Sequence, residues 1–203
     1  PLKGKAPLLV SALMYTNPMM IYFGQELGEK GMDAEGFSGE DGRTTIFDYW
    51  TVDTIRRWRN NGKFDQKLLT EDELSLQDYY AKVLNICNSS EAVREGEFYD
   101  LMYVNPQLQK QYTFVRHSVN ETLLVIANFA SQETEITINV PEHLFEYYGI
   151  KENTACEWTD LLSGSQITTA FSSNMSTKLN VPSWGGCILK MKSVKKAGKK
   201  TKS

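Results

Sequence analysis

The hydrophobic positions near the start of the chain predict a helix followed by a strand. Residues 3–16 place leucine, alanine and methionine side chains on one helical face, as expected for the end of a buried helix. Pro18 closes that segment, and residues 19–23 (MMIYF) form a continuous apolar run, which is typical of a strand buried on both faces of a parallel sheet. Because one strand cannot form a sheet alone, we expect its partner strands to lie elsewhere or to have been cut away.

Two further helices are predicted in the first half of the chain. Within residues 43–64, arginines alternate with aromatic side chains, a pattern that single-stranded nucleic acid can bind, but a short amphipathic helix is the favoured interpretation. This helix is expected to have Thr51 or Asp53 as its N-cap and to end near Gly62. A stronger signal follows at 70–89, where a threonine and a glutamate three residues later make a capping box ahead of apolar residues at helical spacing.

After Gly96 the hydrophobic pattern shortens to a period of two, which predicts β-strands. The strands expected from this pattern cover residues 112–119, 122–130, 134–140, 154–159, 165–169, 176–181 and 186–191. Short strands with turn residues between them are typical of an antiparallel sandwich or half-barrel. We therefore expect two domains, residues 1–95 and 96–192, followed by a basic, disordered tail at 193–203.

The composition is that of an ordinary globular protein, because 41% of the 203 residues are hydrophobic and 23% are charged. A net charge of -3 argues against a chain built around nucleic acid. No apolar run approaches the roughly 18–20 residues that span a bilayer, so we expect no membrane partner either. The chain starts at Pro1 without an initiator methionine or leader, so we expect the natural N-terminus to be missing, and the sequence indicates no localisation.

Histidine and cysteine are too scarce for several common kinds of site. The only histidines, His117 and His143, cannot form a histidine-rich metal site within the chain, and a Ser-His-Asp arrangement would need one of them. The three cysteines, Cys87, Cys156 and Cys187, show neither a zinc spacing nor a disulfide framework. We expect three isolated, buried thiols.

The segment 24–42 is a long loop that carries six of the 14 glycines, interleaved with acidic residues. A loop of this length inside a compact domain is usually functional. No G-K-[S/T] follows, and the acidic side chains would repel a phosphate. Oxygen ligands for calcium are plentiful, but their spacing fits no EF-hand. We therefore expect no metal and no other cofactor in this chain, although calcium stays open for a longer parent protein.

Several of these segments, taken in order, resemble the α-amylase family of glycoside hydrolases. The run NPMMIYFGQELGE looks like the eighth barrel strand and its following turn, with Asn17 in place of a more usual glycine. The positions that match this motif are Pro18, Tyr22, Gly24 and Glu26. The stretch MDAEGFSGEDGRTTIFDYW is similar to the next loop of bacterial starch-degrading members, with Arg43 and Trp50 at matching positions. In the second half, LLVIANFA, DLLSG and a closing P-x-x-G-G-C-I-L-K-M resemble the family's C-terminal β domain.

The resemblance implies an α+β chain in which the last strand and helices of a TIM (β/α)8 barrel precede an antiparallel β-sandwich domain. It also implies a retaining hydrolase of α-glucans, starch or maltooligosaccharides, which needs two carboxyl groups about 5–5.5 Å apart. The family's three catalytic carboxylates follow earlier barrel strands, and no N-H-D context occurs here. We therefore expect no catalytic residue in this chain, an inactive piece when isolated, and a missing N-terminal barrel as its partner. An α-amylase, an α-glucosidase and a transglycosylase all stay open as the parent.

The loop after the eighth strand supplies the candidate substrate-binding residues. Glu26, Asp41 and Arg43 can bond sugar hydroxyls or orient neighbours, and Trp50 can stack on a sugar ring. For Glu26 and Arg43, a structural ion pair that braces the loop is an equal alternative. Without barrel neighbours, the predicted strand would expose edges and apolar surface, so we expect residues 1–25 to mediate self-association or to be poorly ordered.

Two other functions fit the sequence less well. A stand-alone carbohydrate-binding module would need two or three exposed aromatic side chains aligned on one sheet face. The candidates for such a platform are Tyr147, Tyr148, Trp158 and Trp184. A hydrolase that uses the acidic loop itself would need an oriented pair of carboxylates, and no pair is marked in the sequence.

Overall fold

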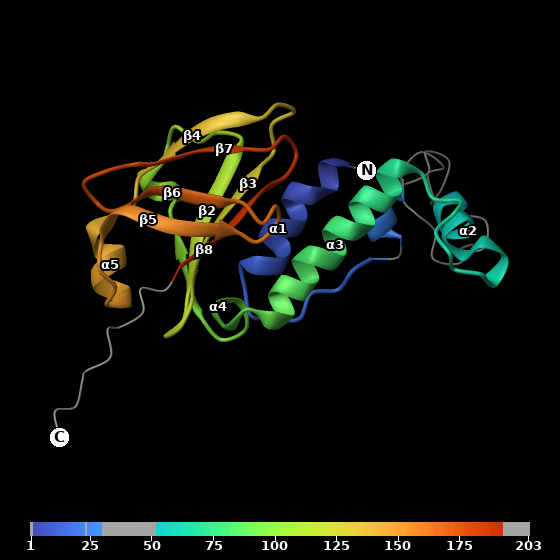
Figure 1. Ribbon diagram of the computed structural model, residues 1–203, viewed down its shortest axis with the longest axis horizontal. Coiled ribbons are helices and arrows are strands. Elements are labelled where there is room, and N and C mark those ends of the chain that lie inside the picture. Colours follow the sequence, from blue (N-terminus) through green and yellow to red (C-terminus); the bar gives the residue numbers. More distant parts are fainter. Residues whose placement is uncertain (1, 23, 30–51, 193–203) are drawn as a thin grey trace, which may run out of the picture.

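The computed structural model describes residues 2–22, 24–29 and 52–192. The helices within residues 5–13 and 71–94 lie on one side of a β-sheet, and a smaller sheet covers the other side (Figure 1). The candidate residues Asp41, Arg43 and Trp50, most of the acidic loop and the basic tail at 193–203 lie outside the described residues. None of the helices in the described part combines the length and the apolar character needed to cross a bilayer.

The helices form largely where the apolar spacing predicts them. A 3-10 turn, η1 (Leu2–Gly4), leads into α1 (Lys5–Leu13), and the long helix α3 (Glu71–Ser89) is followed by α4 (Glu91–Arg94). The predicted capping box of α3 is confirmed, because the Glu73 amide donates to Thr70 Oγ1 and the Thr70 amide donates to Glu73 Oε2.

The short helix α2 (Asp53–Arg59) also forms, and a 3-10 turn, η4 (Asn60–Gly62), extends it to the predicted end. The predicted N-cap is wrong, since Val52 occupies that position with an extended backbone and no side-chain cap. Asp53 is instead the first helical residue, where its charge favours the helix N-terminus. Thr51 lies outside the described residues.

The strand predicted at 19–23 is not formed over residues 19–22, and Phe23 lies outside the described residues. A strand needs a neighbour for its backbone hydrogen bonds, and no described strand of this chain lies beside this segment. The side chains nevertheless alternate, with Met19 and Ile21 partly buried and Met20 and Tyr22 exposed.

The second half of the chain is antiparallel β structure, as predicted. Eight strands form within residues 52–192: β1 (Glu97–Asp100), β2 (Gln111–His117), β3 (Thr122–Asn128), β4 (Thr134–Ile138), β5 (Asn153–Asp160), β6 (Gln166–Phe171), β7 (Thr177–Val181) and β8 (Gly186–Met191). They make a six-stranded sheet, in the order β1-β2-β3-β8-β5-β6, and a two-stranded sheet of β4 and β7. The strand β1 and the helix α5 (Glu142–Tyr148) were not predicted.

The six-stranded sheet is the middle of three layers, and β3 runs through its centre. All seven residues of β3 are buried, so the period of two predicted for this strand is wrong. Leu123 and Val125 pack toward α1 and α3, whereas Leu124 packs toward β4 and β7. In a strand that is buried on both faces, apolar and polar side chains do not need to alternate. Alternation does hold in β4, where Ile136 is buried and Glu135 is exposed.

The three cysteines are free thiols, as predicted. Cys156 and Cys187 are buried and Cys87 is half-buried. Burial raises the pKa of the Cys87 and Cys156 thiols to about 11 and that of the Cys187 thiol to about 12. All three are therefore neutral and poorly reactive near pH 7.

Candidate functional site

Glu26 is the one candidate substrate-binding residue that lies in the described part of the chain. It sits in a tight 3-10 turn, η2 (Gln25–Leu27), between two glycines with left-handed backbones, Gly24 (φ 74°) and Gly28 (φ 69°). A Cβ at Gly24 would approach the Cβ of Glu29 to 2.9 Å, so glycine is required there for both conformation and space. The G-x-x-x-G spacing of the motif therefore shapes this turn.

Gln25 fixes the turn to the long helix α3. Its side-chain oxygen accepts from the Tyr22 amide at 3.1 Å, and its side-chain nitrogen donates to the Tyr80 hydroxyl at 2.9 Å. Burial raises the pKa of Tyr80; the hydrogen bond from Gln25 opposes that rise, and the Glu26 carboxylate adds to it. Tyr80 therefore stays protonated and holds the turn in place.

A pocket of about 490 Å³ lies between this turn, α2 and α3. Its lining includes Tyr22, Glu26, Trp58, Tyr80 and Leu84, so the structure brings Tyr22 and Glu26 to one site. Glu26 is the only carboxylate among the described residues that line it. Aromatic faces with a single carboxylate can hold a sugar ring and accept from its hydroxyls, whereas acid–base catalysis on a glycosidic bond takes two carboxyl groups.

The braces of this region are acidic residues other than Glu26. Glu29 accepts a hydrogen bond from the Thr54 hydroxyl, which ties the turn to α2. The buried Glu73 forms an ion pair with the half-buried Arg57, with Arg57 Nε 3.2 Å from Glu73 Oε2, and this pair ties α2 to α3. Burial alone would raise the pKa of Glu73, but the bonds from Arg57 and the Thr70 amide lower it below its usual value. The expected Glu26–Arg43 brace involves Arg43, which is outside the described residues.

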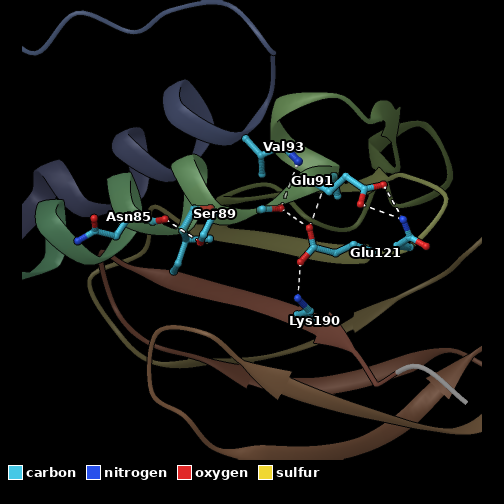
Figure 2. A network of polar contacts seen from close by, with 10 residues as sticks. Asn85, Ser89, Glu91, Val93, Glu121 and Lys190 are labelled. Carbon is cyan, nitrogen blue, oxygen red and sulfur yellow. Dashed lines mark hydrogen bonds and ion pairs between the residues drawn. The ribbon is translucent and has the colours of Figure 1, made fainter. Parts of the chain in front are cut away.

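Glu121 joins the helices to the sheet, a role that no sequence pattern predicts (Figure 2). Its buried carboxylate accepts from Ser90 Oγ at 2.5 Å and from the Ala92 amide at 2.9 Å, and it pairs with Lys190 Nζ at 2.6 Å. Although burial would raise the pKa of Glu121, these partners lower it below its usual value. Ser90 is also the N-cap of α4, since its hydroxyl accepts from the Val93 amide at 3.2 Å.

Arg116 of β2 makes a second connection at the same junction. The residue is 2% exposed, and its guanidinium donates to the backbone oxygens of Met14, Ala92, Val93 and Gly96 at 2.8–3.1 Å. These four oxygens belong to the segment after α1, to α4 and to the turn before β1. One side chain therefore satisfies carbonyl groups from three separate places.

The DLLSG motif also proves structural. The Asp160 carboxylate accepts from the amides of Leu162, Ser163 and Ile188 at 3.1–3.2 Å, and from the Ser163 hydroxyl at 2.5 Å. The Asp160 carboxylate thereby closes the turn after β5 and attaches this turn to β8. Its lone pairs are taken up by these donors, so the motif serves the fold.

The four aromatic side chains considered for a sheet platform do not lie together. Trp158 is fully buried in the core and packs edge-on against Phe171, so this candidate is not available to an exposed platform. Trp158 lies on the face of β5 that packs against the sheet of β4 and β7. The ring of Trp184 is half-buried beneath the Lys3 ammonium, 5.1 Å from its centroid. Tyr147 and Tyr148 belong to α5.

The described ranges contain no group of three or more histidine, cysteine, aspartate or glutamate side chains that could hold a metal ion.

Comparisons with known proteins bear on the fold as a whole. No protein-family model matches the sequence, and no curated protein matches it. Among solved structures, AmyP in complex with maltose covers 93% of this chain with a TM-score of 0.61 and 16% identity. The α-amylase of Geobacillus thermoleovorans complexed with acarbose covers 96%, with a TM-score of 0.56 and 13% identity. The trehalulose synthase MutB from Pseudomonas mesoacidophila MX-45 covers 94%, with a TM-score of 0.58 and 16% identity.

The resemblance to α-amylase-family glycoside hydrolases is confirmed at the level of the fold. This chain corresponds to only 34%, 34% and 38% of those three proteins, about a third of their length. Helices packed on an antiparallel β domain match the C-terminal parts of such enzymes, as the sequence predicts. The likeness extends over both halves of the chain rather than over the β domain alone.

Proposed function

We propose that this chain is the C-terminal part of a retaining glycoside hydrolase that acts on α-glucans. The observation that carries the proposal is the likeness of nearly the whole chain to a third of α-amylase-family structures. Maltose and maltotriose are the ligands of AmyP, which favours starch or maltooligosaccharides as substrates here. The two catalytic carboxyl groups then belong to a barrel that precedes residue 1, and this piece alone is inactive.

In this proposal, residues 1–95 complete the barrel, residues 96–192 form the β domain and residues 193–203 form a tail. The alternation at 19–22 supports it, because Met20 is 84% exposed while Met19 and Ile21 are partly buried against the core. Two-residue alternation is the period of a strand, and a neighbouring barrel strand would cover the outward side chains. In its absence, this apolar surface favours self-association of isolated chains through residues 1–25.

The contribution of this chain to the enzyme is a wall of the substrate cleft. In a barrel enzyme the loops at the carboxyl ends of the strands shape the site, and the loop after the last strand begins at Gly24. Glu26 then accepts from sugar hydroxyls beside Tyr22, and Asp41, Arg43 and Trp50 act from the same loop. The Glu73–Arg57 pair and the Glu29–Thr54 bond hold α2 and the turn in position for this task.

The test compares the isolated chain with the natural protein. An antibody raised against the 203-residue chain is used to precipitate the protein from its source cells, and sugar release from maltoheptaose and starch is measured. We expect activity in the precipitate, none with pre-immune serum and none with the purified chain. A precipitate that contains the protein but leaves both glucans intact would overturn the proposal, and so would hydrolysis by the purified chain at the same specific rate.

A further inference from the structure

Aromatic side chains from three segments gather around the edge strand β1. Tyr99 lies on β1, Tyr103 on the 3-10 turn η5 (Met102–Val104), and His143 and Tyr147 on α5. The Tyr99 ring is the centre of the group, with the ring centroids of the other three 6.0–6.4 Å away. These side chains line a hollow of about 390 Å³ together with Phe98 and Asp100. We name it the tyrosine hollow.

Hydrogen bonds hold the tyrosine hollow in a fixed shape. The Tyr99 hydroxyl lies 2.8 Å from the Tyr103 hydroxyl and 3.0 Å from His143 Nδ1. Burial and the bond to Tyr103 raise the pKa of Tyr99, so this hydroxyl keeps its proton. Tyr147 is fixed at its hydroxyl by a hydrogen bond to Glu97, which raises the pKa of Tyr147. The rings are thus ordered before any ligand arrives, which lowers the entropic cost of binding.

The outer rings of the hollow are open to solvent. Tyr103 is 63% exposed and Tyr147 is 55% exposed, although each presents a large apolar face. Exposed aromatic clusters of this kind mark binding surfaces more often than chance positions on a protein surface.

The chemistry of the lining selects the ligand. Among the described residues that line the hollow there is neither lysine nor arginine, and Asp100 contributes a negative charge, so an anionic ligand is disfavoured. Phenol and imidazole groups both donate and accept hydrogen bonds, and ring faces take up apolar C–H groups. A neutral ligand with C–H faces and a rim of hydroxyl groups fits this combination, which is the chemistry of a pyranose ring.

We propose that the tyrosine hollow binds a glucose unit of an α-glucan, with Tyr103 and Tyr147 as its stacking faces. The glucose identity rests on the proposed function, whereas the preference for a neutral pyranose rests on the lining. The hollow is not an extension of the Glu26 pocket, because α5 and α2 lie at opposite ends of the molecule (Figure 1). Glucan held here would stay attached to the β domain between productive encounters.

The binding test uses the full chain and maltoheptaose, with amylopectin retardation in native gels as a second readout. The double variant Tyr103→Ala/Tyr147→Ala removes both stacking faces at exposed positions, and Phe129→Ala, a 37% exposed aromatic that lines neither pocket, is the control. We expect the double variant to bind at least about tenfold more weakly and the control to bind like the wild type. Circular dichroism verifies that each variant is folded.

A site-resolved measurement locates the sugar. Titration with maltoheptaose should shift the ring C–H resonances of His143 and leave those of His117 unchanged, and 0.5 M salt should not weaken the effect, because the ligand is neutral. Equal binding by the double variant, or shifts absent at His143, would overturn the proposal. Binding of cellohexaose in place of maltoheptaose would overturn the glucose-polymer assignment. If maltoheptaose fails to bind while the precipitated natural protein hydrolyses it, only the tyrosine hollow is refuted and the proposed function stands.

Discussion

Replacing Arg116 with methionine should destabilise this fold more than any other single change at the junction between helices and sheet. Methionine keeps much of the arginine's length and apolar bulk, but it cannot donate to a carbonyl oxygen. The four acceptors, on Met14, Ala92, Val93 and Gly96, then lose their partner together.

The expected cost follows from the number of acceptors and their burial. A buried polar group without its partner costs about 1–3 kcal/mol, and a hydrogen bond from a charged donor contributes about 1.5–3 kcal/mol. Such terms are not additive, and water can reach carbonyls near the surface. We therefore expect Arg116→Met to lower the free energy of unfolding by about 3–5 kcal/mol, a large share of the 5–15 kcal/mol typical of a domain.

Urea unfolding, followed by tryptophan fluorescence and far-ultraviolet circular dichroism, measures this loss. Arg94→Met is the matched control, because Arg94 is exposed and its ion pair with Glu95 spans 3.8 Å at the surface. We expect the control to change the free energy of unfolding by less than about 0.5 kcal/mol. An Arg116→Met protein within 1 kcal/mol of the wild type, at an unchanged urea slope, would refute the role assigned to this side chain.

Three further changes test other parts of the fold. The pKa of Glu121 is lower in the folded state, so the stability that this carboxylate contributes is present above about pH 4.5 and is lost on further acidification. In urea titrations, Glu121→Gln should therefore flatten the loss of stability between pH 6 and pH 3. Burial lowers the pKa of His117, so the unfolded chain binds the proton first and the free energy of unfolding falls as the pH drops below about 6.5. His117→Asn should reduce the slope of the free energy of unfolding against pH between pH 7 and pH 5. An unchanged slope would contradict the burial argument. Gly186→Ala should lower the melting temperature and cost at least about 1–3 kcal/mol, because the new Cβ would lie 2.0 Å from the Ile126 oxygen. Gly185→Ala serves as the comparison, because a Cβ there would meet the Ser183 oxygen at 3.5 Å, an ordinary contact.

The sequence predicts the elements whose signals are local. The capping box at Thr70 and Glu73 and the apolar face of α3 are visible within a few residues of one another, and the structure has both. The turns between the later strands likewise depend on neighbouring residues, so seven of the eight strands were expected near their observed positions. The change from helical spacing to a period of two after Gly96 predicts helices followed by a sheet, and the family resemblance added what kind of protein has these segments in this order.

The elements that were missed depend on partners far along the chain. The strand β1 has four residues, too few for a pattern, and it exists because it pairs with β2. The helix α5 is only seven residues long and rich in aromatic side chains, which are poor helix formers. Its ends did carry a usable signal, namely Pro141 at the start and Gly149, with a left-handed backbone, at the end.

The candidate site was predictable only in part. The motif around Glu26 indicated a loop at the end of a strand, and the structure brings Tyr22 and Glu26 to one pocket. The roles of Arg116 and Glu121 could not be read from the sequence, because their partners lie 20 to 102 residues away and no local pattern connects them. The tyrosine hollow was missed for the same reason, since β1, η5 and α5 meet only in the folded chain.

The most direct test of the central claim is the mass of the natural polypeptide, measured by immunoblot of source cells with an antibody against this chain. The account predicts a band well above 23.1 kDa, enlarged by most of a barrel of about 250 residues. A single band at 23.1 kDa would contradict it, because the catalytic carboxyl groups would then have no barrel to carry them.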